Sequence, residues 1–168
     1  PLVAKINSNT VLHKTEIGGV ITNINNEKQL KQKTNKFKGS ILIEKMITDN
    51  VFEMIIGIKN DNQFGPTIIL GAGGIYTELF KDTTTLLLPL NKKIILQEIK
   101  KLKFSKILFG FRGKKGGDVK SLVNIILKIA KFAEKNSDKV SEVDINPLIV
   151  CKKGKGVIAV DALIHYFE

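Results

Sequence analysis

Two apolar runs rich in Ile and Val, at 142–151 and 157–161, flank the Lys/Gly segment 152–156 near the carboxyl end of the chain. This pattern predicts a β-hairpin, that is, two paired strands joined by a tight turn. In the first run Asp144 and Asn146 alternate with aliphatic residues. We therefore expect the two polar side chains on one face of the sheet and the aliphatic ones toward the core.

The register of this hairpin depends on its turn. If Lys153-Gly154 is a two-residue turn, residues whose numbers sum to 307 face each other. Asn146 and Asp161 would then lie directly across the ladder, close enough for their oxygens to hold one hard cation. A different turn length shifts this register. The residues alone leave open a second interpretation, in which Asn146 starts a turn before Pro147 and Asp161 is a strand-end residue.

Short apolar runs predict further strands in the first half of the chain. They cover residues 2–6, 20–24, 40–47, 52–58 and 67–71. Turn residues separate the last three runs, so the segment 40–71 predicts an antiparallel meander. A run at 85–90 contains a proline and predicts an edge strand.

Helical spacing is clearest in the second half of the chain. Asn91 is a suitable cap for a helix that extends to about residue 102, and Asp118 for a second helix. The apolar stripe of the second helix comprises Val119, Leu122, Val123, Ile126, Ile129, Ala130 and Ala133. A polar helix is predicted over 26–36 and a glycine-rich basic loop over 109–117. Strands and helices together predict an α+β fold with antiparallel sheets packed against helices.

The composition bounds the class of protein. The chain has 168 residues, 43% hydrophobic and 26% charged, which is enough for one domain or two small lobes with a real core. No apolar run approaches the roughly 18 residues of a membrane span, so we expect no membrane partner. The single cysteine, Cys151, fits a reducing cytosol and predicts a cytoplasmic location. The chain begins at Pro1 without an initiator Met, which predicts a missing amino-terminal part.

The net charge of +11 raises the question of nucleic acid as a partner. Arg112 is the only arginine among the 27 basic residues. Proteins that read nucleic acid generally use the planar, forked guanidinium group of arginine. The charge therefore favours a solvated lysine-rich surface over a nucleic-acid-binding stripe.

Two features near the amino end suggest phosphate chemistry. Lys5 lies in an apolar strand, where an ammonium group is costly to desolvate unless it meets an anion; a strand-end lysine that reaches water is the alternative. Gly18-Gly19 can direct backbone N–H groups at a phosphate, and an ordinary hairpin turn also uses paired glycines. His13, in the preceding polar loop, suits a phosphoryl acceptor, a general base or an inert loop position.

Several motifs occur along the chain in the order known from one family. They are Lys5, His13-Lys-Thr-Glu-x-Gly-Gly19, Glu53, Gln63-Phe-Gly-Pro66, Gly71-x-Gly-Gly-x-x-x-Glu78, Phe111-Arg-Gly113 and Asp144-Ile-Asn-Pro-Leu148. The set resembles the ATP-grasp domain of nucleoside-diphosphate-forming acyl-CoA synthetases, such as the β subunit of ADP-forming acetate–CoA ligase. It is similar, more distantly, to the β subunit of succinyl-CoA synthetase. The resemblance covers essentially the whole chain and implies an ATP-grasp fold, with an incomplete first lobe at 1–46 and a second lobe at 47–168.

The resemblance implies a reaction and a nucleotide site. The family makes acyl-CoA, ADP and phosphate from an acid, CoA and ATP, or runs in reverse, through an acyl phosphate and a phosphohistidine. Lys5 would contact the ATP or ADP phosphates and Gly18 and Gly19 would lie over them. The strand from Glu44 to Met46 would line the adenine pocket.

The resemblance also implies roles for residues outside this strand. Glu53 would belong to the nucleotide site, and Asn146 and Asp161 would hold the nucleotide's Mg²⁺. His13 aligns with a loop histidine proposed to relay phosphate to ATP or ADP in the acetate-type enzymes.

The family further implies partners. CoA-binding and ligase domains would be supplied by the same or a partner chain, and the complete protein would be a hetero- or homo-oligomer. Two alternatives remain: a catalytically silent, synthetase-like regulatory module linked to an acetyltransferase, and a lysine-rich nucleic-acid-binding protein. Retention of His13 and of both predicted metal ligands argues against the first.

Overall fold

A computed structural model of the chain describes residues 1–7, 17–74, 77 and 81–167. The chain divides into two compact units, Pro1–Thr48 and Asp49–Glu168. In the part that the structure describes, every strand pairing is antiparallel. No helix of this part is long and apolar enough to cross a membrane.

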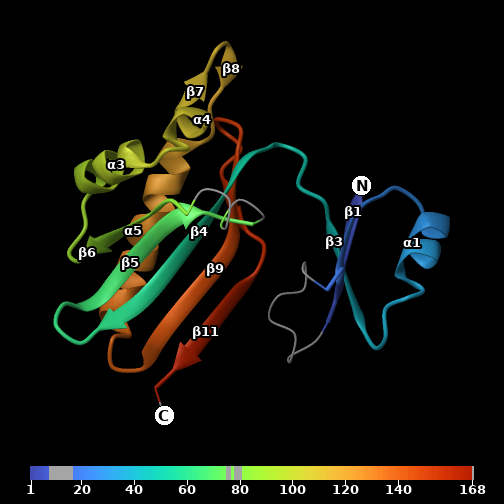
Figure 1. Cartoon of the computed structure of the whole chain (residues 1–168), viewed down its shortest axis with the longest axis horizontal. Coiled ribbons are helices and arrows are strands. Elements are labelled where there is room, and N and C mark those ends of the chain that lie inside the picture. Colours follow the sequence, from blue (N-terminus) through green and yellow to red (C-terminus); the bar gives the residue numbers. More distant parts are fainter. Residues whose placement is uncertain (8–16, 75–76, 78–80, 168) are drawn as a thin grey trace. The chain divides into compact units, whose positions relative to one another are not determined.

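The first unit is a small sheet with one helix beside it (Figure 1). Strands β1 (Leu2–Ile6), β2 (Val20–Ile24) and β3 (Ile41–Lys45) pair in the order β2-β1-β3. Helix α1 (Glu27–Thr34) follows β2, and the side chain of Asn26 caps it by accepting a hydrogen bond from Gln29 N–H. The polar helix predicted for this region is thus present, and it begins with a local capping bond.

The meander predicted over 40–71 is wrong in its first strand. β3 pairs with β1 of the first sheet, and the backbone N–H of Met46 extends this ladder by donating to the carbonyl of Pro1 at 3.0 Å. Only the strands that follow Thr48 form the hairpin expected for this region. An apolar run identifies a strand, but its partner is chosen by long-range packing that periodicity does not encode.

The described residues of the second unit form a six-stranded sheet. Its strands are β4 (Asn50–Asp61), β5 (Gly65–Ala72), β6 (Thr83–Leu87), β9 (Val140–Cys151), β10 (Val157–Ala159) and β11 (Ala162–Tyr166). They pair in the order β10-β9-β4-β5-β6, and β11 also pairs with β9. The strand predicted at the proline-containing run lies at an edge of this sheet, as expected, because among the described strands β6 pairs with β5 alone.

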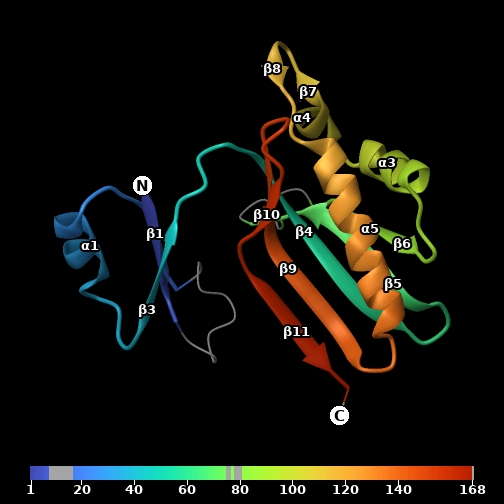
Figure 2. The same cartoon turned by 180° about the vertical axis from the view of Figure 1, so that it is seen from behind.

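Helices cover one face of this sheet (Figure 2). They are α3 (Lys92–Lys101), α4 (Ser105–Phe109) and α5 (Val119–Lys135). The residues of β4 that face them are buried together with the apolar stripes of α3 and α5. These include Met54, Ile56, Ile99 and Ile126, each fully buried. Both amphipathic helices predicted from the sequence are confirmed, including their caps at Asn91 and Asp118.

The basic segment predicted as a loop over 109–117 contains regular structure. The short helix α4 precedes it, and strands β7 (Gly110–Phe111) and β8 (Lys114–Lys115) form a two-stranded hairpin. Gly110 and Gly113 have positive φ angles, which glycine adopts without a steric penalty. The glycines that suggested a loop instead permit this tight hairpin.

The predicted register of the terminal hairpin is confirmed. Val157 faces Val150 and Ala159 faces Leu148, and both pairs sum to 307. The turn at Lys153-Gly154 is closed by the backbone N–H of Lys155, which donates to the carbonyl of Lys152 at 2.9 Å. The same register continues into β11, a strand that the sequence analysis did not predict.

Asp118 joins this turn to the main helix. Its Oδ1 accepts from the backbone N–H of Ser121 at 3.1 Å and so caps α5, while its Oδ2 accepts from Gly154 N–H and Gly156 N–H, both at 3.0 Å. The residue is 7% exposed. Burial alone would raise the pKa of Asp118, but the N–H groups of Ser121, Gly156 and Gly154 outweigh burial and hold the pKa below its usual value.

We expect Asp118→Ala to lower the free energy of unfolding by about 2–3 kcal/mol, because three backbone N–H groups lose their acceptor. The matched control is Asn91→Ala, which removes a single capping bond on α3 and should cost about 1 kcal/mol. Urea unfolding of both variants measures the difference. Equal losses would mean that the two bonds to the hairpin turn add nothing.

The contribution of Asp118 to the free energy of unfolding should also depend on pH. Because its folded-state pKa is depressed, the contribution is complete above the unfolded-state pKa of about 4. It is lost as pH falls through the lower, folded-state pKa. The difference in the free energy of unfolding between wild type and Asp118→Ala should therefore become smaller at acidic pH.

Candidate functional site

In the first unit, Lys5 is held by a carboxylate on the neighbouring strand. Its Nζ lies 2.6 Å from Oε2 of Glu44, and the residue is 7% exposed. In the ladder Val3 faces Glu44, so Lys5, two residues further along β1, projects from the same face as Glu44. The ion pair compensates part of the cost of burying the ammonium group. The sequence singled out both residues, but it did not predict that they pair.

The paired glycines lie beside Lys5 in the ladder. The carbonyl of Gly19 accepts from Ile6 N–H at 2.9 Å, and Val20 faces Lys5 across the ladder. Gly18 has φ +66°, and a Cβ built there would lie 3.7 Å from Nζ of Lys36. The glycine turn thus has an exposed ammonium group next to it, which the sequence analysis did not identify.

The structure gives little information on two of the predicted site residues, Met46 and His13. Met46 is half-buried and follows β3 directly. His13 lies outside the described residues, so its relay role stays a prediction.

In the second unit, Asn146 and Asp161 are neighbours across the terminal hairpin. The backbone N–H of Asn146 donates to the carbonyl of Asp161 at 3.2 Å, and both residues are half-buried. Oδ1 of Asp161 accepts from its neighbour Ala162 N–H at 3.1 Å. The adjacency that the register predicted is therefore present.

A β-bulge lies at Asn146. On β4, Met54 faces Leu148 and Ile56 faces Ile145, so the two residues Asn146 and Pro147 oppose one residue of β4. Such bulges re-aim side chains and are common next to functional sites. The bulge was not predicted, because alternation along one strand gives no count of the residues opposite it.

A turn after β5 connects Asn146 to Glu53. Gly74 N–H donates to Oδ1 of Asn146 at 2.9 Å, and Gly73 N–H donates to the backbone carbonyl of Glu53 at 2.9 Å. Burial raises the pKa of the Glu53 carboxyl. The structure thus brings Glu53 and Asn146 to the same turn, a connection that the sequence did not reveal.

The side-chain oxygen atoms of Asn146 and Asp161 are chemically suited to bind a magnesium ion. Mg²⁺ prefers oxygen ligands and usually takes one or two from the protein, with the rest from water and substrate phosphates. The carboxylate of Asp161 and the amide oxygen of Asn146 are of this kind. Among the described residues, no group of three or more His, Cys, Asp or Glu side chains could hold a metal by itself. The residues fit an ion shared with a phosphorylated ligand.

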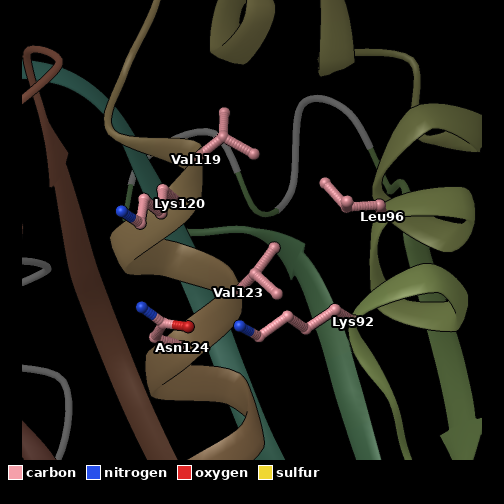
Figure 3. A pocket seen from close by; sticks show the side chains of 6 residues that line it. All are labelled: Lys92, Leu96, Val119, Lys120, Val123 and Asn124. Atoms are coloured by element: carbon pink, nitrogen blue, oxygen red, sulfur yellow. The ribbon is translucent and has the colours of Figure 1, made fainter.

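A pocket of the second unit lies elsewhere, between α3 and α5 (Figure 3). Its volume is about 270 Å³. Figure 3 shows Lys92 extending from α3 toward Val123 and Asn124 of α5. None of the predicted site residues lines it, so it is separate from the candidate site.

Comparison with known proteins assigns the family. Residues 1–165 match the ATP-grasp domain family. The chain belongs to the ATP-grasp family. The predicted α+β ATP-grasp fold and the predicted relationship to acyl-CoA synthetases are thereby confirmed.

Relatives of this ATP-grasp chain include subunits and longer single-chain enzymes. It is 34% identical to the β subunit of ADP-forming acetate–CoA ligase II of Pyrococcus furiosus, covering 98% of this chain and 74% of that subunit. It is 36% identical to the ADP-forming 4-hydroxybutyrate–CoA ligase of Nitrosopumilus maritimus, covering 98% of this chain and 25% of that protein. The chain thus corresponds to most of a β subunit and to a quarter of a longer ligase.

A solved structure has the same fold. It is the dinucleotide-forming acetyl-coenzyme A synthetase 1 of Ca. Korarchaeum cryptofilum, in complex with coenzyme A and Mg-AMPPCP. The TM-score is 0.84 at 34% sequence identity, over 99% of this chain and 76% of that one. In that structure the phosphohistidine segment points towards the nucleotide-binding site.

Proposed function

We propose that this chain is the nucleotide-binding ATP-grasp module of an ADP-forming acyl-CoA synthetase of the acetate type. It would transfer phosphate between a phosphohistidine and ADP or ATP with magnesium. The observation that carries the proposal is the hairpin register, which puts Asn146 beside Asp161 in a chain of the ATP-grasp family. The solved relative with Mg-AMPPCP supports a magnesium-bound nucleotide as the ligand.

The side chains suit phosphoryl transfer, which depends on positioning and charge neutralisation. Lys5 would neutralise phosphate oxygens, and its ion pair with Glu44 holds the ammonium group in place until a phosphate arrives. The turn at Gly18-Gly19 would bring backbone groups close to the phosphates. Asn146 and Asp161 would hold a magnesium ion, which supplies charge stabilisation to the transferred phosphoryl group.

The relatives support an inference about the partners of this chain. We infer that CoA-binding and ligase domains, in the same chain or a partner chain, supply the phosphohistidine and the acyl chemistry. The β-subunit name of one relative and the greater length of the other support this inference. We also infer an oligomeric complete enzyme and a cytoplasmic location, the latter consistent with the single free, buried Cys151.

Lys5→Ala in the complete enzyme tests this assignment. We expect nucleotide affinity to fall about 10- to 100-fold, the cost of losing a charge-assisted contact to phosphate. The control variant replaces Lys28, Lys31 and Lys33 of α1, which are exposed. It should bind nucleotide almost as wild type does. Titration calorimetry with ADP measures both, and equal losses would mean that diffuse charge governs binding.

A further inference from the structure

The turn formed by Gly73 and Gly74 holds the amide of Asn146 through a single backbone group. Gly74 N–H donates to Oδ1 of Asn146 at 2.9 Å, across 72 residues of sequence. A backbone N–H needs an acceptor, and of the two amide atoms of asparagine only the oxygen accepts. This bond therefore determines which amide atom faces the turn, and it opposes the flipped rotamer, which would place NH₂ there.

The turn itself is seated against β4. Gly73 N–H donates to the carbonyl of Glu53 at 2.9 Å, and a Cβ at Gly73 would collide with the backbone of Met54. Gly73 does not have a positive φ, so its requirement for glycine comes from this close approach alone. Any side chain at Gly73 would lift the turn from the strand.

The far side of the turn is also anchored. The carbonyl of Gly74 accepts from the backbone N–H of Thr77 at 3.3 Å and from its Oγ1 at 2.9 Å. Gly74 has φ +57°, and a Cβ there would collide with Oε2 of Glu53. The Gly73–Gly74 peptide group that contacts Asn146 thus lies between two peptide groups that are each held by hydrogen bonds.

We propose that the Gly73-Gly74 turn is a positioning element that selects the cation-binding orientation of the Asn146 amide. With Oδ1 directed by Gly74 N–H, its remaining lone pair is available to a hard cation; a flipped amide would offer N–H hydrogens, which repel one. Neighbours that orient a metal ligand in this way affect metal affinity although they never touch the metal. The inference rests on the proposed function, since it takes Asn146 as a ligand of the nucleotide's magnesium.

Gly73→Ala in the complete enzyme is the primary test, with ADP binding measured by calorimetry with and without Mg²⁺. We expect affinity for ADP with Mg²⁺ to fall about 10- to 100-fold. Affinity for ADP without Mg²⁺ should not change. The control is Gly65→Ala at the first residue of β5, where nothing lies within 4 Å of a Cβ although φ is +70°. It should retain the wild-type response to Mg²⁺.

A second pair of variants separates orientation from general damage. Both oxygens of aspartate can accept, so Asn146→Asp has no wrong orientation. Gly73→Ala added to Asn146→Asp should therefore lower Mg²⁺-dependent affinity much less than it does in the wild-type background. If Gly73→Ala fails to fold, Thr77→Val replaces it in both backgrounds. It removes one hydrogen bond from the Gly74 carbonyl and should weaken Mg²⁺-dependent binding about three- to tenfold.

The outcomes are distinct. Unchanged Mg²⁺-dependent affinity in Gly73→Ala, or an equal loss in the Asn146→Asp background, would overturn the positioning role while leaving the proposed function standing. If the wild-type enzyme binds ADP equally well with and without Mg²⁺, the proposed function itself fails and this inference fails with it.

Discussion

His13→Ala in the complete enzyme is expected to abolish acyl-CoA formation while nucleotide binding remains nearly intact. We expect turnover to fall at least about 10³-fold, the scale on which loss of a catalytic side chain lowers kcat. A histidine nitrogen can carry a phosphoryl group between separated sites, which is the role predicted for His13. Its position five residues before Gly18 puts it on the sequence leading into the predicted phosphate turn.

The partial reactions identify the step that His13 serves. If it relays phosphate to ADP, acyl phosphate should still phosphorylate the partner site in His13→Ala, and only the transfer to ADP should stop. The matched control is His165→Ala, since His165 is the other histidine of the chain and lies exposed on β11. Wild-type turnover in His13→Ala would mean that phosphate reaches the nucleotide by another route. It would also revive the catalytically silent interpretation of the module.

The second large effect is expected at the hairpin. Asn146→Ala and Asp161→Ala should each weaken binding of ADP with Mg²⁺ by about 100-fold or more, because each variant removes one of the two predicted protein ligands of the ion. Binding of ADP without Mg²⁺ should change little. The hairpin should stay folded, since the bond between these residues in the ladder joins Asn146 N–H to the Asp161 carbonyl and involves backbone atoms only.

Asp138→Ala is the control for this experiment. Asp138 is exposed, and its replacement changes the net charge as much as Asp161→Ala does. It should leave Mg²⁺-dependent binding unchanged. Normal affinity for ADP with Mg²⁺ in both hairpin variants, or an equal loss in Asp138→Ala, would remove the metal assignment. Thermal unfolding of each variant separates lost binding from lost structure.

Features that depend on neighbouring residues were predictable. Asn91 and Asp118 cap their helices through bonds to residues three positions ahead, so their chemistry is readable from a short window. The register of the terminal hairpin followed from a two-residue turn and the period of two along a strand. The adjacency of Asn146 and Asp161 was a consequence of that register.

Other parts of the candidate site depend on segments far apart in the sequence. Lys5 and Glu44 were each predicted to belong to the nucleotide site, but the ion pair between them was not predicted. Asp118 is a helix cap in the sequence, and only the folded chain gives it Gly154 and Gly156 as further donors. In each case the side chain could form its ion pair or hydrogen bond with several residues, and the sequence does not show which of them lies next to it in the folded chain.

The sequence by itself therefore determined most of the strands, the two amphipathic helices, the hairpin register and the motifs of the ATP-grasp family. The strands, helices and register depend on interactions between residues a few positions apart. The family motifs depend on the order of particular residue types along the chain. Only the tertiary structure decided that β3 joins β1 rather than β4, and that Gly74 holds the amide of Asn146. The physical reason is that such contacts are closed by packing of distant segments, whose geometry depends on the whole core and not on local periodicity.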